Sequence, residues 1–212
     1  MLFATKGRGV AGVRGTMDGG GLLKEAPKLI VIAGLVGVLF FFGLLVLERI
    51  PEIPVDIDQK PFFIPFLFAA LLPRGWPTVA VALGTALGEG FGDILEGFEP
   101  DDPVGFFGYL IGVIIFGFMV AGRPQNRGLV ALACVVGAGV QAFIEASAFL
   151  IFAEEGLLVA LWSATGNTIT HGVIWGVIPM LILVPLLHGR IERFLGYPPQ
   201  GDVGASAKSS AY

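Results

Sequence analysis

Charged residues are scarce in this sequence, and there is only one cysteine. Charged residues make up 14% of the 212 residues, against roughly 25% in soluble domains. Hydrophobic residues make up 55%, and a chain this apolar is expected to be an integral membrane protein with no separate soluble catalytic domain. The single cysteine, Cys134, lies in an apolar run and excludes a disulfide framework.

The sequence also lacks the motifs of several enzyme classes. It has no G-x-x-x-x-G-K-[ST] phosphate loop and no H-E-x-x-H zinc motif. Ser147 and Ser163 do not lie in the strained, glycine-flanked turn expected of a nucleophile working with His171. We therefore expect no enzymatic activity, no cofactor and no bound metal. The basic residues fit membrane topology better than nucleic-acid binding.

Six apolar segments are separated by polar or proline-containing stretches. A helix needs about 20 apolar residues to cross a bilayer. The second segment is short and begins and ends with proline, so we expect a tilted, broken or partial span. The sequence predicts an all-α, six-helix transmembrane bundle over 29–195, a flexible basic arm over 1–28 and a disordered tail over 196–212. The six segments are 29–47, 61–73, 76–95, 104–121, 128–153 and 158–188.

Lysine and arginine residues indicate the orientation of the chain. If the N-terminus is cytoplasmic and six segments cross in turn, only Arg49 and Lys60 fall outside, and all other lysines and arginines lie in cytoplasmic segments. The outer loops then hold most of the acidic residues. This sorting predicts a multi-pass protein of the cell membrane with both termini in the cytoplasm.

Polar residues within the third, fifth and sixth segments occur at similar depths. A charge in the hydrocarbon core costs at least about 2.5–3.5 kcal/mol, so these groups are expected to face one another or a watery cavity. At about 1.5 Å per residue, Glu89, Glu145 and Asn167 all lie about 9–12 Å below the outer ends of their segments. We therefore predict an outward-facing pocket, with interhelical hydrogen bonding as the alternative role of these groups. The candidate substrate-binding residues are Glu89, Asp93, Gln141, Glu145, Asn167, His171 and Trp162.

Small residues recur at intervals of four along several segments, including Ala33 and Gly37 in the first and Gly84 and Gly88 in the third. Such residues allow helix backbones to approach closely. Internal packing explains most of them. Because the first segment otherwise lacks polar residues, Ala33 and Gly37 are the best candidates for an interface with an external membrane partner.

The run from Arg74 to Asp93 resembles the third helix of the substrate-binding S components of energy-coupling factor (ECF) transporters. The matching features are the Gly75/Pro77 turn, the small-residue helix and Gly92-Asp93 near its outer end. Over 29–195, the size, the six segments and the polar sixth segment agree in outline. The chain departs from the family at Gly37, where alanine is frequent, and in its short second segment.

The resemblance implies that the chain captures a vitamin, a precursor or another small micronutrient near the outer face. It would then dock on a membrane T component driven by two ATPase subunits. The carboxylates favour a cationic substrate. Two alternatives stay open: a structural subunit of a membrane complex, and a stand-alone metal- or proton-coupled carrier that uses Glu89, Asp93, Glu145 and His171.

Overall fold

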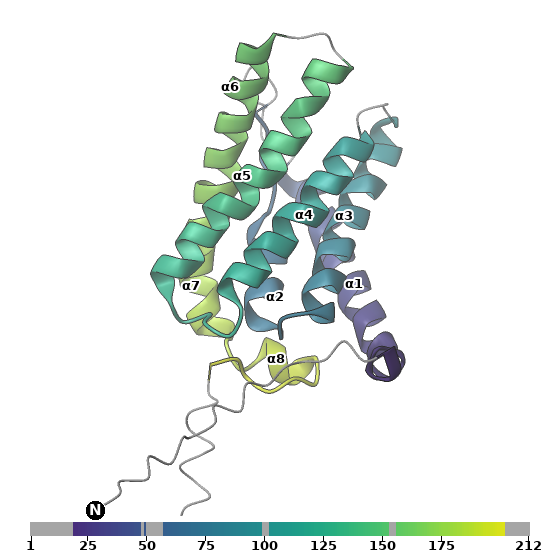
Figure 1. Ribbon diagram of the computed structural model, residues 1–212, viewed down its shortest axis with the longest axis vertical. Helices are drawn as coiled ribbons and strands as arrows, with labels where there is room; N and C mark the ends of the chain where they lie inside the picture. Colours follow the sequence, from purple (N-terminus) through teal and green to yellow (C-terminus); the bar gives the residue numbers. More distant parts are fainter. Residues whose placement is uncertain (1–18, 48, 50–56, 99–101, 153–155, 202–212) are drawn as a thin grey trace, which may run out of the picture.

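The computed structural model is a bundle of helices, described over residues 19–47, 49, 57–98, 102–152 and 156–201 (Figure 1). Helix formation follows from the long apolar stretches, which satisfy their backbone hydrogen bonds internally. The elements are α1 (Gly19–Leu47), α2 (Phe63–Leu71), α3 (Trp76–Glu96), α4 (Asp102–Val120), α5 (Arg127–Ile151), α6 (Leu157–Asn167), the π-helix η1 (Thr168–Val177), α7 (Ile178–Leu187) and α8 (Ile191–Phe194).

Five of these helical stretches are long and apolar enough to cross a membrane. They are Leu23–Leu47 within α1, α3, α4, α5 and the continuous helix Leu157–Leu187 formed by α6, η1 and α7. The second predicted segment behaves differently, because α2 has only nine residues. At about 1.5 Å per residue it covers about 14 Å, less than half of the roughly 30 Å hydrocarbon core. The all-helical membrane fold is thus supported, with five helices of spanning length.

Helix α2 lies in the middle of the bundle and fills one half of it (Figure 1). Every residue from Pro65 to Leu71 is buried, and the helix contacts α1, α3, α4, α7, α8 and η1. The ring of Phe66 stacks on Phe116 of α4 at 4.1 Å between centroids. This half of the bundle is therefore a packed apolar core.

Helices α1 and α3 cross through their small residues. A side chain on Gly37 would meet the carbonyl oxygen of Gly84 at 2.9 Å, and one on Gly88 would meet the carbonyl oxygen of Gly37 at 2.6 Å. A side chain on Gly84 would collide with the backbone of Ala33. The predicted partner interface at Ala33 and Gly37 is therefore wrong, because α3 of the same chain occupies that surface.

Both predicted terminal segments differ partly from expectation. Helix α1 begins at Gly19, so residues 19–28 are helical, and 1–18 lie outside the described residues. The three glycines at its start cost about 1 kcal/mol each in a helix, but the apolar run continues from Leu23. In the predicted tail, Tyr197 is packed at the base with 9% exposure, and 202–212 lie outside the described residues.

The last long helix contains ten residues of π-helix between α6 and α7. A π-helical stretch is rare and is often found at functional sites. Gly172 lets η1 approach the backbone of α5, since a side chain there would meet the Cα of Val135 at 3.2 Å. This close approach places His171, which is fully buried, against α5.

Candidate functional site

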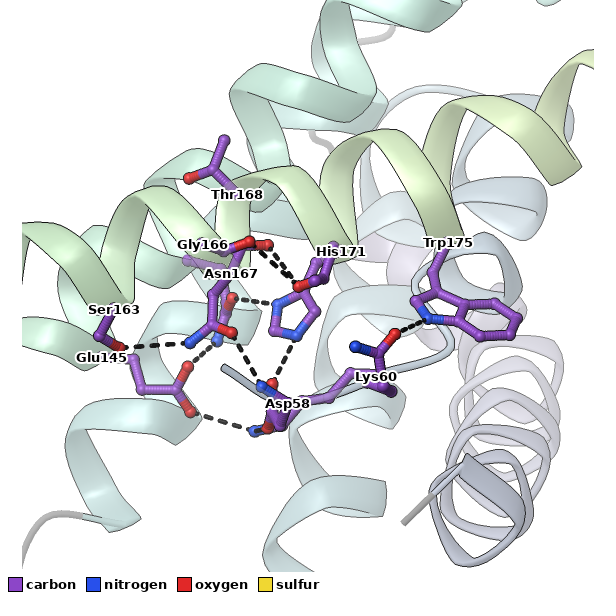
Figure 2. A network of polar contacts seen from close by, with 12 residues as sticks. Asp58, Lys60, Glu145, Ser163, Gly166, Asn167, Thr168, His171 and Trp175 are labelled. Carbon is purple, nitrogen blue, oxygen red and sulfur yellow. Dashed lines mark hydrogen bonds and ion pairs between the residues drawn. The ribbon is translucent and has the colours of Figure 1, made fainter. Parts of the chain in front are cut away.

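A network of polar side chains joins α3, α4, α5, α6 and η1 to the non-helical segment that precedes α2. Figure 2 shows Glu145, Asn167 and His171 pointing toward Asp58 and Lys60. We call this network the Lys60 cluster. Its members are Asp58, Lys60, Glu89, Tyr109, Gln141, Glu145, Asn167 and His171.

Lys60 is the centre of the cluster. Its Nζ lies 2.8 Å from Oε1 of Glu89, 3.2 Å from Oε1 of Glu145 and 3.0 Å from Oδ2 of Asp58. The lysine side chain is only 13% exposed. Three carboxylates from three different parts of the chain thus converge on one buried ammonium.

Asp58 is held by two further residues from the last long helix. Its backbone N–H donates to Oδ1 of Asn167 at 3.1 Å, and its Oδ1 lies 2.6 Å from Nε2 of His171. The other ring nitrogen of His171 lies 3.4 Å from Oε1 of Gln141. Both ring nitrogens therefore face side-chain oxygens, and the ring links the non-helical segment to α5.

The other two carboxylates are also positioned by hydrogen bonds. Tyr109 donates its hydroxyl to Oε1 of Glu89 at 2.9 Å, and Gln141 donates from Nε2 to Oε2 of Glu145 at 2.6 Å. Among the described residues, Oε2 of Glu89 is buried and has no hydrogen-bond partner. The cluster therefore keeps one acceptor unused.

Aromatic rings form one wall of the cluster. Phe62 stacks on His171 with centroids 4.9 Å apart and on Tyr109 with centroids 5.7 Å apart. The Nζ of Lys60 lies 5.3 Å from the centre of the Tyr109 ring, within the reach of a cation–π interaction. Beyond Phe62 lies the apolar core around α2, so this wall separates the polar cluster from the opposite half of the bundle.

Five of the seven predicted site residues meet in the cluster, and two do not. Asp93 lines a separate apolar groove of about 330 Å³ between α3 and α4, together with Asp102 and Phe106. Trp162 is 60% exposed on the outside of the bundle. Asp93 lies four residues, or about 6 Å along the helix axis, beyond Glu89, so it reaches the groove at the end of α3 instead of the cluster.

Sequence reasoning missed Asp58, Lys60 and Tyr109 as members of the site. Lys60 could have been found as one of only two lysines and arginines outside the segments predicted to be cytoplasmic, directly before an apolar stretch. Tyr109 is the one residue with a side-chain hydroxyl in the fourth predicted segment. Asp58 carries no such signal, since it is one of several acids in the same loop.

Comparisons with known proteins give one match. Residues 31–211 match the model of a family of unknown function (DUF8171). No curated protein and no solved structure matches the chain. Among the described residues, no group of three or more histidine, cysteine, aspartate or glutamate side chains is arranged to hold a metal ion, and the ammonium of Lys60 occupies the point where the carboxylates converge.

Proposed function

We propose that this chain, which belongs to a family of proteins of unknown function (DUF8171), is the substrate-binding subunit of an uptake transporter. It captures a small cationic micronutrient from outside the cell and passes it to an ATPase-driven membrane partner. The convergence of three carboxylates on one buried cation carries this proposal. The ATPase-driven partner comes from the resemblance to ECF S components.

The proposed topology is six crossings of the cell membrane with both termini in the cytoplasm. The start of α1 and α8 lie at the same end of the bundle (Figure 1), which supports an even number of crossings. The second crossing is then made by the non-helical segment before α2 together with α2 itself. Non-helical backbone is tolerated at membrane depth where protein surrounds it, and Lys60 and α2 are both surrounded.

The position of the cluster supports capture rather than transport by this chain alone. Its helical residues lie in the second halves of α3 and α5, in the first half of α4, and on α6 and η1, whereas the apolar helix α2 fills the other half of the bundle. A stand-alone carrier needs polar groups along its whole path. An energised partner that opens the bundle removes this need.

Native mass spectrometry of the protein purified from cells grown in rich medium is expected to show a bound small molecule. In Glu145→Gln, which removes one carboxylate charge, the affinity for this molecule should fall at least about tenfold and its occupancy should drop, because a charge-assisted hydrogen bond contributes about 1.5–3 kcal/mol. Trp162→Ala is the control and should retain the molecule, since its side chain lies outside the bundle. Loss of the molecule from Trp162→Ala with retention by Glu145→Gln would contradict the site.

The compound identified in this way should bind to the isolated chain in liposomes without ATP and without a partner. Accumulation against its gradient should not occur, because α2 closes the path through the chain. The measurement is uptake of the labelled compound with an imposed ion gradient. Accumulation under these conditions would contradict the proposal and favour the ion-coupled carrier.

One observation favours a structural subunit as the second candidate function. Most polar atoms of the cluster already have partners within the chain, and Lys60 neutralises part of its acidity. Such a network can act as interhelical hydrogen bonding alone. A purified protein that carries no small molecule, and that co-purifies with other membrane subunits in fixed ratio, would support this candidate.

A further inference from the structure

We infer that the Lys60 cluster recognises a primary ammonium group and that the side chain of Lys60 is a tethered occupant of this subsite. The inference rests on the proposed function and names the chemical class of the substrate. The incoming ammonium takes the place of Nζ of Lys60 among the carboxylates of Asp58, Glu89 and Glu145.

The number and placement of the acceptors select this class of cation. A primary ammonium has three N–H donors and no acceptor, and here each of three carboxylates supplies one oxygen at 2.8–3.2 Å from Nζ. A quaternary ammonium has no N–H to donate. A guanidinium is planar and favours bidentate contact with one carboxylate, so it does not match acceptors from three separate elements.

The carboxylates are held in place by side chains other than Lys60. Tyr109 fixes Glu89, Gln141 fixes Glu145, and His171 fixes Asp58. The acceptors are therefore positioned before a ligand arrives, which lowers the cost of binding. The ring of Tyr109 covers a further side of this ammonium subsite, with its centre 5.3 Å from Nζ of Lys60.

One atom of the cluster points to a ligand independently of the acidic groups as a set. Oε2 of Glu89 has no hydrogen-bond partner among the described residues, and this side chain is only 9% exposed. A buried acceptor left without a donor costs about 1–3 kcal/mol. A ligand with a second donor next to its ammonium would satisfy this oxygen.

Lys60 can serve as a tethered occupant because it does not belong to a helix. It lies on the segment before α2, which is attached to the last long helix through Asp58 and through a 2.6 Å hydrogen bond from Trp175 to Gln59. A tethered group competes with a free ligand at an effective concentration in the millimolar range. Removing the lysine side chain should therefore raise the affinity for a free amine.

The test replaces the lysine by alanine and returns the missing atoms as a free molecule. Lys60→Ala removes Cγ, Cδ, Cε and Nζ, which together correspond to n-propylammonium. In detergent at neutral pH, n-propylammonium should raise the unfolding temperature of Lys60→Ala by about 5–11 °C at 100 times its Kd. The buried Cys134, the one cysteine of the chain, allows unfolding to be followed with a thiol-reactive dye.

Three comparisons at equal ionic strength make the result specific. The wild-type chain should shift by less than a fifth as much, because Lys60 fills the subsite. Tetramethylammonium, which lacks N–H donors, and n-propanol, which lacks the charge, should not stabilise Lys60→Ala. Stabilisation by tetramethylammonium equal to that by n-propylammonium would overturn the inference.

A second variant covers the case in which Lys60→Ala does not fold. Lys60→Ala combined with Glu145→Gln leaves two carboxylates and reduces their repulsion, and n-propylammonium should still stabilise it, with weaker affinity. If neither variant is stabilised, the inference is wrong.

The co-purified compound separates a failure of the subsite from a failure of the proposed function. A co-purified compound without a primary amine, found when neither variant is stabilised, would overturn the ammonium subsite and leave the capture function intact. Stabilisation by n-propylammonium of a chain that carries no co-purified compound would support the subsite and count against capture.

Discussion

Replacing Lys60 by methionine should lower the unfolding temperature by roughly 6–20 °C. Methionine keeps the apolar stem but leaves Asp58, Glu89 and Glu145 without their shared cation. Breaking a buried ion pair by removing one partner costs about 3–5 kcal/mol, and each kcal/mol corresponds to about 2–4 °C in a chain of this size. The loss is measured by thermal unfolding in detergent with a dye that reacts with Cys134.

Two further variants define what this result means. Lys24→Met changes an exposed lysine of α1 and should shift the unfolding temperature by less than about 1 °C. Adding Glu89→Gln to Lys60→Met should restore part of the lost stability, because one of the repelling carboxylates becomes neutral. If Lys60→Met is as stable as Lys24→Met, the buried ion pairs do not contribute to the fold.

Replacing Gly84 by alanine should destabilise the protein by about 1–3 kcal/mol, the usual cost of overpacking a close contact. The added methyl group would collide with the backbone of Ala33, which cannot move without shifting α1 as a whole. Gly88→Ala should behave in the same way, since its methyl group would lie 2.6 Å from the carbonyl oxygen of Gly37. Thermal unfolding of both variants measures the effect.

Gly92→Ala provides a control on the same helix. A methyl group there meets nothing within 4 Å, and alanine is favoured over glycine in a helix by about 1 kcal/mol. This variant should be as stable as the wild type or slightly more stable. Equal unfolding temperatures for Gly84→Ala and Gly92→Ala would show that the crossing of α1 and α3 tolerates separation.

The convergence of α3, α5 and the last long helix could be predicted because two strong physical effects agree. The cost of exposing a carboxylate to lipid requires Glu89 and Glu145 to face inward. The constant rise of a helix then relates their positions in the sequence to depth. The structure links both residues through Lys60 and links Glu145 to His171 through Gln141.

The contribution of the segment before α2 could not be predicted in the same way. Non-helical residues such as Asp58 and Lys60 have no periodicity from which a direction or a depth can be derived. The charge rule for membrane topology counts lysines on each side of the membrane, so it places Lys60 outside without indicating that it folds back into the bundle.

Small residues raise a different difficulty. The spacing of Ala33 and Gly37 is the same whether a helix packs against its own chain or against a partner, because both contacts need close backbone approach. Only the position of α3 decides between these two contacts, and α3 places Gly84 against Ala33 and Gly37 and places Gly88 against Gly37. A pairing between two such patterns within one chain is therefore a better first hypothesis than an external interface.

The short, central helix α2 has a consequence for how the protein is made. It cannot remain in lipid alone, because nine residues do not cross the hydrocarbon layer and the non-helical backbone before it needs protein around it. Its neighbours α3, α4 and α7 are synthesised after it. If α2 and the segment before it make the proposed second crossing, that crossing is completed only after the last long helix has entered the membrane. Insertion then does not proceed helix by helix in chain order.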